Sequence, residues 1–161
     1  MSYLIDGSNF LGRLGNRVKD AEDKIDLARR LSMFQRQTRA RVILVFDGAP
    51  VPGLETPPAP PGRRTLAILF PAEGDKADDL IMDIILKQKD PSHIVLVTSD
   101  RELAGFGRDG GARVVGCSEF AKKLRGTVKD FHRARASLKR EIKPPAGLDL
   151  RLWLDVFKER R

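Results

Sequence analysis

Aspartates follow the apolar segments of this 161-residue chain, at positions where carboxylates are able to hold a divalent cation. Asp6 ends the first segment, Asp47 follows the second, and Asp100 follows the fourth. The third segment leads through a loop to Asp75, Asp78 and Asp79. Crowded carboxylates repel one another unless a proton or a cation lies between them, and oxygen-rich clusters suit Mg²⁺ or Mn²⁺. The first expectation is a metal-dependent enzyme that acts on phosphate esters.

Each of these acids also has an ordinary structural explanation. Asp6 and Asp47 each precede a glycine, as in tight turns, and Asp100 is suited to cap a helix. Asp75 is expected to cap the helix that starts near it, which leaves Asp78 as the preferred ligand from that helix and Asp79 as the second. Acids at four successive strand-to-helix transitions are unusual for capping alone, so the joint pattern favours a metal site.

Polar side chains beside the acids extend the candidate site. Gly7 is expected to let the backbone turn sharply after Asp6. Ser8 and Asn9 are placed to orient a water molecule or to hydrogen-bond Asp6. Thr98 and Ser99 precede Asp100, where they are suited to bind phosphate or a metal-bound water.

The apolar segments predict a parallel sheet, because short continuous apolar runs are typical of buried strands. The expected strands are 2–6, 41–46, 65–70, 94–98 and 113–115. A loop is expected around Gly12 and Gly15, and helices are expected over 20–39, from about 75, from about 100 and from about Ser118. This alternation predicts an α/β fold with helices on both faces of the sheet. The carboxyl ends of the strands then form one crevice, where the aspartates converge.

Two segments fall outside this alternation. Residues 50–62 contain six prolines and are expected to form a stiff surface loop. Residues 127–161 are expected to form a basic helical extension to a domain at 1–126, with a last helix that has an apolar face of Leu150, Trp153, Leu154 and Phe157.

The charge is divided unevenly along the chain. Residues 1–121 carry 17 basic and 17 acidic side chains, whereas residues 122–161 carry 13 basic and 5 acidic ones, so the net charge of +8 lies in the last quarter. Such asymmetry favours a polyanionic partner, although a solvated basic helix explains it as well. No apolar stretch reaches the length of a membrane span, and the first strand begins at once, so we expect a cytoplasmic protein without a signal peptide or membrane association.

The sequence lacks the residue patterns that several other kinds of site require. The two histidines, His93 and His132, do not have zinc-ligand spacing, and the chain contains neither a phosphate-binding P-loop motif nor a nucleophile-elbow motif. The single cysteine, Cys117, cannot form an internal disulfide and is expected to be a small buried residue.

Several of these motifs together resemble a PIN-like NYN-domain nuclease, most closely the bacterial YacP-like family. The matching residues are 4–9, 45–48, 77–79, 98–100 and 118–121, within a similarity over roughly 1–125. The resemblance implies a PIN-like three-layer α/β/α sandwich with a central, mainly parallel sheet, followed here by the C-terminal helical extension. It also implies a metal-dependent endoribonuclease that uses Mg²⁺ or Mn²⁺.

Carried over residue by residue, the resemblance implies a site on these strand ends. The implied catalytic residues are Asp6, Asn9, Asp78 and Asp100. The implied metal ligands are Asp6, Asp78 and Asp100, with Asp47 and Asp79 as auxiliary acids. The expected RNA contacts are Ser8, Arg63, Arg64, Lys122, Lys123, Arg125, Lys129, Arg133 and Arg135. The expected partner is RNA (mRNA, tRNA or rRNA), with association with the ribosome and a homodimer both left open.

Three rival readings stay open at this point. The first is a non-catalytic RNA-binding module of the same fold, although unneutralised carboxylates oppose RNA binding. The second is a phosphoacceptor signalling domain, which ranks lower because no lysine follows a late strand end. The third is a DNA or structured tRNA substrate.

Overall fold

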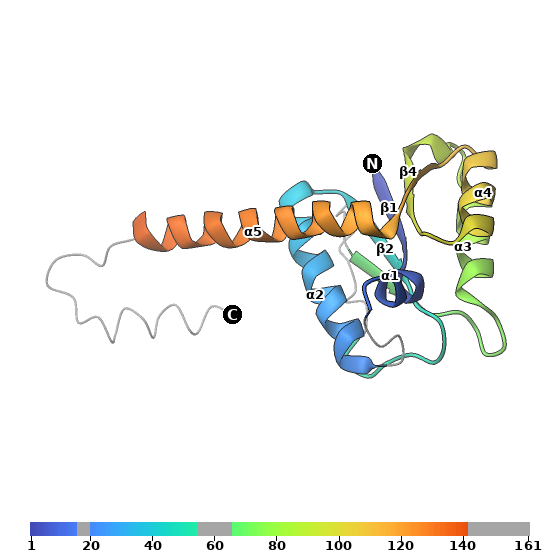
Figure 1. Ribbon diagram of the computed structural model, residues 1–161, viewed down its shortest axis with the longest axis horizontal. Helices are drawn as coiled ribbons and strands as arrows, with labels where there is room; N and C mark the ends of the chain where they lie inside the picture. The colour runs from blue at the N-terminus through green and yellow to red at the C-terminus, as the bar shows by residue number, and fades with distance from the viewer. Residues whose placement is uncertain (16–19, 55–65, 142–161) are drawn as a thin grey trace, which may run out of the picture. The chain divides into compact units, whose positions relative to one another are not determined.

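The computed structural model describes residues 1–15, 20–54 and 66–141 of the chain (Figure 1). The chain divides into two compact units, Met1–Val128 and Lys129–Arg161. The sheet and the strand-end aspartates all belong to the first unit. In the second unit, the described residues continue a helix that begins in the first.

A five-stranded parallel sheet forms the centre of the first unit. Its strands are β1 (Ser2–Asp6), β2 (Arg41–Val45), β3 (Leu66–Leu69), β4 (Ile94–Val97) and β5 (Arg113–Val115). They lie in the order β3-β2-β1-β4-β5, so that β1 is central and pairs with β2 on one side and β4 on the other. The winding reverses beside β1, which is where open α/β sheets bind ligands.

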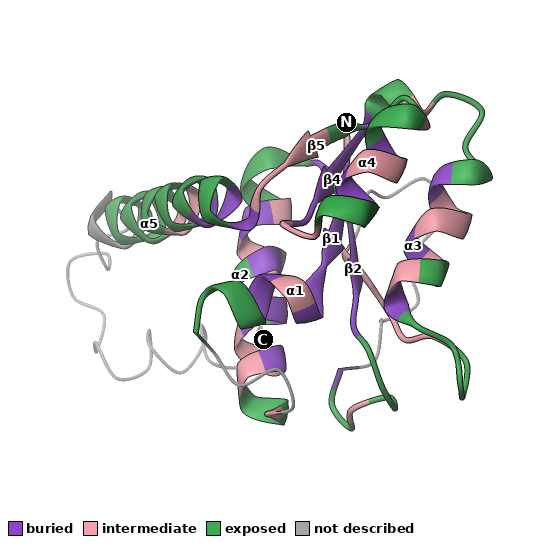
Figure 2. Ribbon diagram, turned by 45° about the vertical axis from the view of Figure 1, so that its right-hand side comes forward, coloured by how far each residue is buried: buried purple, intermediate pink, exposed green. Residues whose placement is uncertain are grey.

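Helices cover both faces of the sheet. One face packs against α1 (Gly7–Arg13), α2 (Ala21–Thr38) and α5 (Cys117–Glu141), and the other against α3 (Ala77–Leu86) and α4 (Arg101–Asp109). Figure 2 shows β1, β2 and β4 buried between helices whose outer faces are exposed. This arrangement confirms the predicted α/β/α sandwich with a parallel sheet.

Apolar alternation along each strand divides the core into two layers. In β2, Val42 and Leu44 face α2, whereas Ile43 and Val45 face α3 and α4. A cluster of aromatic rings, in which Tyr3, Phe34 and Phe120 lie within 5.1–5.6 Å of one another, fixes α2 and α5 on the first layer. The buried side chains of the second layer are all aliphatic, among them the fully buried Ile81.

Three sequence predictions need correction. The loop expected around Gly12 and Gly15 is in part the helix α1, which Asp6 caps. The helix expected to start at Ser118 starts at Cys117, and it continues through Gly126 to Glu141 without a break. The helix expected from Asp75 begins at Ala77, which leaves Asp75 outside it.

The predicted domain boundary at 126 lies inside α5 and stays a prediction. The apolar helix expected around Trp153 lies outside the described residues. Within the part of the chain that is described, no helix combines the length and the apolar character needed to cross a bilayer.

Candidate functional site

Asp6 occupies the centre of the candidate site, at the carboxyl end of the central strand. Its side chain is buried, with 3% of the residue exposed. One carboxylate oxygen accepts a hydrogen bond from the backbone N–H of Asn9 at 3.3 Å, which caps α1. The other accepts from the Thr98 hydroxyl at 3.3 Å, across from β4. The strand end, the first turn of α1 and the segment after β4 thus meet on one carboxylate.

The electrostatic state of Asp6 reflects this position. Its pKa is raised from 3.8 to about 6. Burial is the largest cause and the carboxylates of Asp78 and Asp47 add to it, whereas the hydrogen bonds from Asn9 and Thr98 oppose it. An anion in such surroundings is stabilised by a bound cation. Asp6 is therefore the acid whose environment most favours metal binding.

Asn9 has its side-chain oxygen fixed by three donors. The backbone N–H of Ser99 donates to Asn9 Oδ1 at 2.8 Å, and the Cys117 thiol donates to the same oxygen at 3.2 Å. The third donor is the Thr98 hydroxyl at 3.4 Å, whose single proton is shared between Asn9 and Asp6. A backbone N–H can only donate, so the acceptor must be the amide oxygen and the orientation of the amide is settled. The amide nitrogen forms no hydrogen bond within the described residues, so it is available as a donor.

Asp47 has a different role from the one expected of a metal ligand. Its Oδ1 accepts a hydrogen bond at 2.8 Å from the backbone N–H of Ala77, the first residue of α3. Its own N–H donates to the Ser8 hydroxyl oxygen at 3.0 Å. Asp47 therefore supplies the cap of α3 that the sequence assigned to Asp75, and Asp75 is exposed.

The first turn of α3 brings Asp78 to the site. Burial is the largest cause that raises the pKa of Asp78. Repulsion from the carboxylates of Asp100, Asp47 and Asp79 raises it as well, whereas the Lys76 ammonium lowers it. Asp79 is exposed. Asp6 and Asp78, together with the carboxylates of Asp47 and Asp100 that act on them, form one acidic cluster, which we call the strand-end cluster.

Asp100 combines capping with membership of the strand-end cluster. Its Oδ1 accepts a hydrogen bond from the backbone N–H of Leu103 at 2.9 Å and so caps α4, as the sequence predicted. Its backbone N–H donates to Thr98 Oγ1 at 3.1 Å, the same hydroxyl that donates to Asp6. Thr98 is therefore a direct link between Asp6 and the segment that positions Asp100.

The donor set of the strand-end cluster fits a hydrated cation better than a closed metal cage. Within residues 1–15, 20–54 and 66–141, no three histidine, cysteine or acidic side chains are close enough together to hold an ion directly. Mg²⁺ keeps several of its waters and often binds through one or two carboxylates. Burial, together with repulsion from neighbouring carboxylates, raises the pKa values of Asp6 and Asp78, and a hydrated cation here would relieve both effects.

The basic residues predicted to contact RNA lie in three different parts of the chain. Arg63 and Arg64 lie outside the described residues. Lys122, Lys123 and Arg125 are exposed on α5, and the Lys123 ammonium donates to the Tyr3 hydroxyl at 2.6 Å. Tyr3 lies toward the amino-terminal end of β1, whereas Asp6 lies at its carboxyl end.

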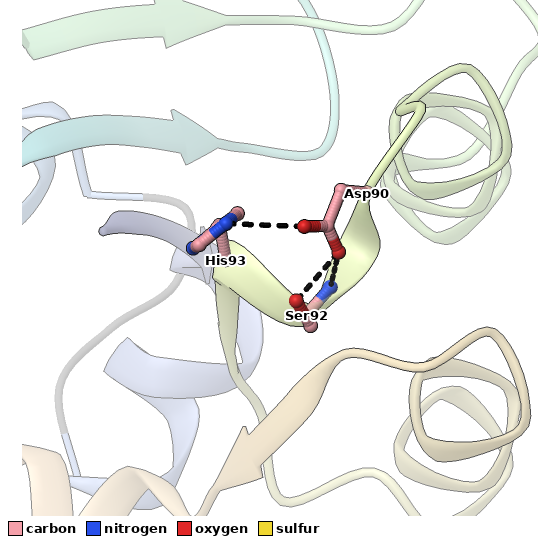
Figure 3. Close-up of polar contacts among 3 residues, drawn as sticks. All are labelled: Asp90, Ser92 and His93. Carbon is pink, nitrogen blue, oxygen red and sulfur yellow. Dashed lines mark hydrogen bonds and ion pairs between the residues drawn. The ribbon is translucent and has the colours of Figure 1, made fainter.

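The remaining predicted contacts lie on the part of α5 in the second unit: Lys129, Arg133 and Arg135, all exposed. Of the two histidines, His132 belongs to the second unit and His93 to the first. His93 pairs with Asp90 at 3.1 Å beside Ser92 (Figure 3), just before β4 begins and so at the opposite end of that strand from Thr98.

Sequence reasoning missed two contributors. Cys117 is buried as expected, but its thiol also positions Asn9, and its backbone N–H donates to the Ser99 hydroxyl at 3.0 Å. Burial raises the pKa of this thiol, which keeps it protonated and able to donate. Lys76, at the N-cap position of α3, is the cation that acts on Asp78. The position of Lys76 in the sequence, within the acidic segment 75–79, could have indicated this role.

Comparison with known proteins supports the same reading of the fold. The family model described as "YacP-like NYN domain" matches residues 3–152. A crystal structure of Rae1 (YacP) from Bacillus subtilis is similar with 26% identity and a TM-score of 0.68, over 99% of this chain and 91% of that one. A mutant form of the same protein gives 21% identity and a TM-score of 0.69, over 88% and 85% of the two chains. Among curated proteins, a sequence search finds no match.

Proposed function

This chain belongs to the YacP-like NYN domain family, and from that premise we propose that it is a metal-dependent endoribonuclease that hydrolyses RNA phosphodiester bonds. Membership of the family suggests a nuclease. The observation that supports the rest is the raised pKa of Asp6 and of Asp78 within the strand-end cluster. Burial and the neighbouring carboxylates both disfavour the charged forms of these acids, and a divalent cation would relieve both effects.

In this proposal, the acids have different roles according to their positions. Asp6, Asp78 and Asp100 would hold one or two Mg²⁺ or Mn²⁺ ions, in part through metal-bound waters, with Asp47 and Asp79 as outer acids. A bound ion of this kind lowers the pKa of water and stabilises charge on the attacking and leaving oxygens. The Thr98 hydroxyl holds the Asp6 carboxylate in place through its 3.3 Å hydrogen bond.

Asn9 is proposed to act on the substrate as a hydrogen-bond donor. Its amide oxygen is occupied by donors from Ser99 and Cys117, so the free amide N–H groups are left to bind a phosphate oxygen or the attacking water. Donors that are fixed before the substrate binds are effective because they need no reorganisation during the reaction. Ser8 has a structural part in this proposal, because its hydroxyl oxygen accepts from Asp47 N–H.

The proposed substrate is RNA in the cytoplasm, as mRNA, tRNA or rRNA, free or on the ribosome. The exposed basic residues of α5 would attract the phosphate backbone from a distance. They would thereby offset the repulsion between the strand-end cluster and a polyanion.

The test is a cleavage assay on labelled single-stranded RNA and on DNA of the same sequence, with Mn²⁺, with Mg²⁺ and with EDTA. We expect the RNA to be cut internally with either metal and to stay intact in EDTA. Asp78→Asn should abolish cleavage, whereas Asp83→Asn should not, because Asp83 lies on the same helix but forms an exposed pair with Lys87. Binding of RNA without cleavage under all conditions would favour a non-catalytic RNA-binding module instead.

A further inference from the structure

A cavity lies between two loops at the carboxyl end of the sheet, and the proposed mechanism does not use it. Its volume is about 480 Å³, and residues 48–50 and 71–75 line it. These residues follow β2 and β3, so the cavity lies at the same end of the sheet as the strand-end cluster. Small-molecule sites have volumes of roughly 300–1,000 Å³, so this cavity is large enough for a nucleobase. We call it the loop pocket.

The backbone fixes both walls of the loop pocket. The N–H of Phe46 donates to the Leu69 carbonyl at 3.0 Å, which keeps β2 and β3 paired up to the two loops. In the second loop, the N–H of Asp75 donates to the Ala72 carbonyl at 2.9 Å and closes a turn. Gly74 has a φ of 86° in this turn, a conformation that favours glycine. Walls that are already in place lower the entropy cost of binding a ligand.

Both walls lead directly into the strand-end cluster. Gly48 follows Asp47, and Asp75 precedes Asp78 by three residues, which limits the distance between their Cα atoms to about 11 Å. The two walls also meet, because Asp47 Oδ1 accepts a hydrogen bond from the Ala77 N–H at 2.8 Å. An RNA strand that is cleaved at the strand-end cluster is therefore able to place a neighbouring nucleotide in the loop pocket.

The side chains of the loop pocket suit an uncharged ring that carries hydrogen-bond donors. Pro50, Pro71 and two alanines give the pocket apolar surface, and Glu73 and Asp75 add exposed carboxylates. None of these lining residues is basic, so the pocket would repel a phosphate group. An ionised carboxylate can only accept hydrogen bonds, so the ligand must donate them.

We propose that the loop pocket binds a guanine base of the RNA strand, in a nucleotide next to the cleaved phosphodiester bond. The inference rests on the proposed function and adds a base preference to the same site. Proteins read single-stranded RNA through splayed-out bases, which they hydrogen-bond on the Watson–Crick edge.

Guanine is the base whose donors match a carboxylate best. Its Watson–Crick edge presents two adjacent donors, N1–H and N2–H, and the two oxygens of one carboxylate accept both. Adenine and cytosine present one donor beside an acceptor, and uracil presents one donor between two carbonyl groups. Each of these three bases therefore places an acceptor where a carboxylate oxygen would repel it.

The experiment measures the preference for guanine, and not the overall affinity for RNA. A short fluorescent oligouridine is compared with the same RNA carrying two central guanines or two central inosines, which lack the N2 amino group. Binding to the full chain is measured in EDTA. The double variant Glu73→Gln and Asp75→Asn removes both carboxylates, and Ala72→Phe fills the loop pocket. The control variant Asp109→Asn and Glu119→Gln removes two exposed acids that do not line the loop pocket.

We expect the wild type to bind the guanine RNA about 5- to 10-fold more tightly than oligouridine, with the inosine RNA in between. This ratio is in the lower part of the range for a bidentate contact to a base, because Glu73 and Asp75 are exposed. The double variant should lose the ratio, although its affinity for both RNAs should rise because two negative charges are removed. Ala72→Phe should lose the ratio as well, and the control variant should keep it.

Equal binding of the guanine RNA and oligouridine by the wild type would overturn the proposal, and so would a ratio that the double variant retains. If the double variant does not fold, the ratio in Ala72→Phe decides by itself.

Cleavage of a random RNA pool with Mn²⁺, followed by sequencing of the product ends, separates this inference from the proposed function. We expect guanine to be enriched at one position next to the cut. A wild type that prefers guanine in binding but leaves the RNA intact would support the base pocket and refute the proposed nuclease function. Cleavage without guanine enrichment next to the cut would refute this inference alone.

Discussion

The ends of β1 and β2 carry the same local sequence, an apolar strand followed by aspartate and glycine, yet the two aspartates have different environments. Asp6 is buried on the central strand, and burial raises its pKa to about 6. Asp47 is exposed, and its carboxylate accepts from the first N–H of α3. The role of an aspartate at a strand end therefore depends on the elements that pack around it, and not on its own sequence motif.

The largest expected effect is on cleavage by Asp6→Asn. If Asp6 is the main ligand, the variant should lose at least about 100-fold in activity, more than the loss typical of residues that only support a ligand. Asp47→Asn, which retains an oxygen acceptor for Ala77, should lose less than about 10-fold. Single-turnover cleavage of labelled RNA with Mn²⁺ measures both variants. Equal losses in the two would remove the distinction between the two strand ends.

The second effect concerns stability against pH. The pKa of Asp6 is 3.8 in the unfolded chain and about 6 in the folded one, so the folded state holds the proton more tightly. The stabilisation of the folded state by the protonated Asp6 carboxyl is therefore complete below about pH 4. It is lost as the pH rises through about 6, and the free energy of unfolding falls by about 3 kcal/mol. In urea unfolding with EDTA, the free energy of unfolding of Asp6→Asn should therefore rise relative to that of the wild type between about pH 4 and about pH 6. A difference in the free energy of unfolding between the two proteins that does not change with pH would contradict the raised pKa of Asp6.

The third effect tests the cap from Asp47. Asp47→Ala leaves the Ala77 N–H without its side-chain acceptor and should lower the free energy of unfolding by about 1 kcal/mol. Asp75→Ala should change it by less, because Asp75 is exposed and lies outside α3. Thermal unfolding of the two variants makes the comparison, and a greater loss from Asp75→Ala would restore the sequence-based assignment.

The smallest effect concerns Cys117. Cys117→Ala removes one of three donors to Asn9 Oδ1 and leaves the stronger Ser99 N–H bond in place. We expect kcat to fall by about 2- to 5-fold, since a net hydrogen bond contributes about 1 kcal/mol or less. Cys117→Ser should restore most of the rate, because its hydroxyl is also a donor. Identical kinetics in all three proteins would show that the thiol does not position Asn9.

Much of the fold could be predicted, because strands reveal themselves through continuous apolar runs. The limits of β1 and β5 agree with the predicted ones, those of β2 and β4 differ by one residue at the carboxyl end, and β3 lies within the predicted 65–70. The helix α1 was missed because glycine, serine and asparagine, which open it, are poor helix formers. It forms because Asp6 caps it and because Phe10 and Leu11 are buried against the core.

The contacts within the candidate site could not be predicted, since they join positions far apart in the chain. Nothing near Ala77 in the sequence indicates that its N–H is satisfied by Asp47, 30 residues earlier. Gly7 was expected to serve a sharp turn, but what requires glycine there is the closeness of the Phe46 ring. The metal, the RNA contacts and the catalytic roles stay predictions.

The hydrogen bonds of Asn9 have a consequence for the moment at which activity appears during synthesis. Its partners Ser99 and Cys117 follow it by 90 and 108 residues, so the amide is oriented only when most of the first unit has been made. Contacts of such long sequence separation form late in folding. A nascent chain that ends before Cys117 should be unable to cut RNA, and cleavage can therefore report when the parallel sheet has closed around β1.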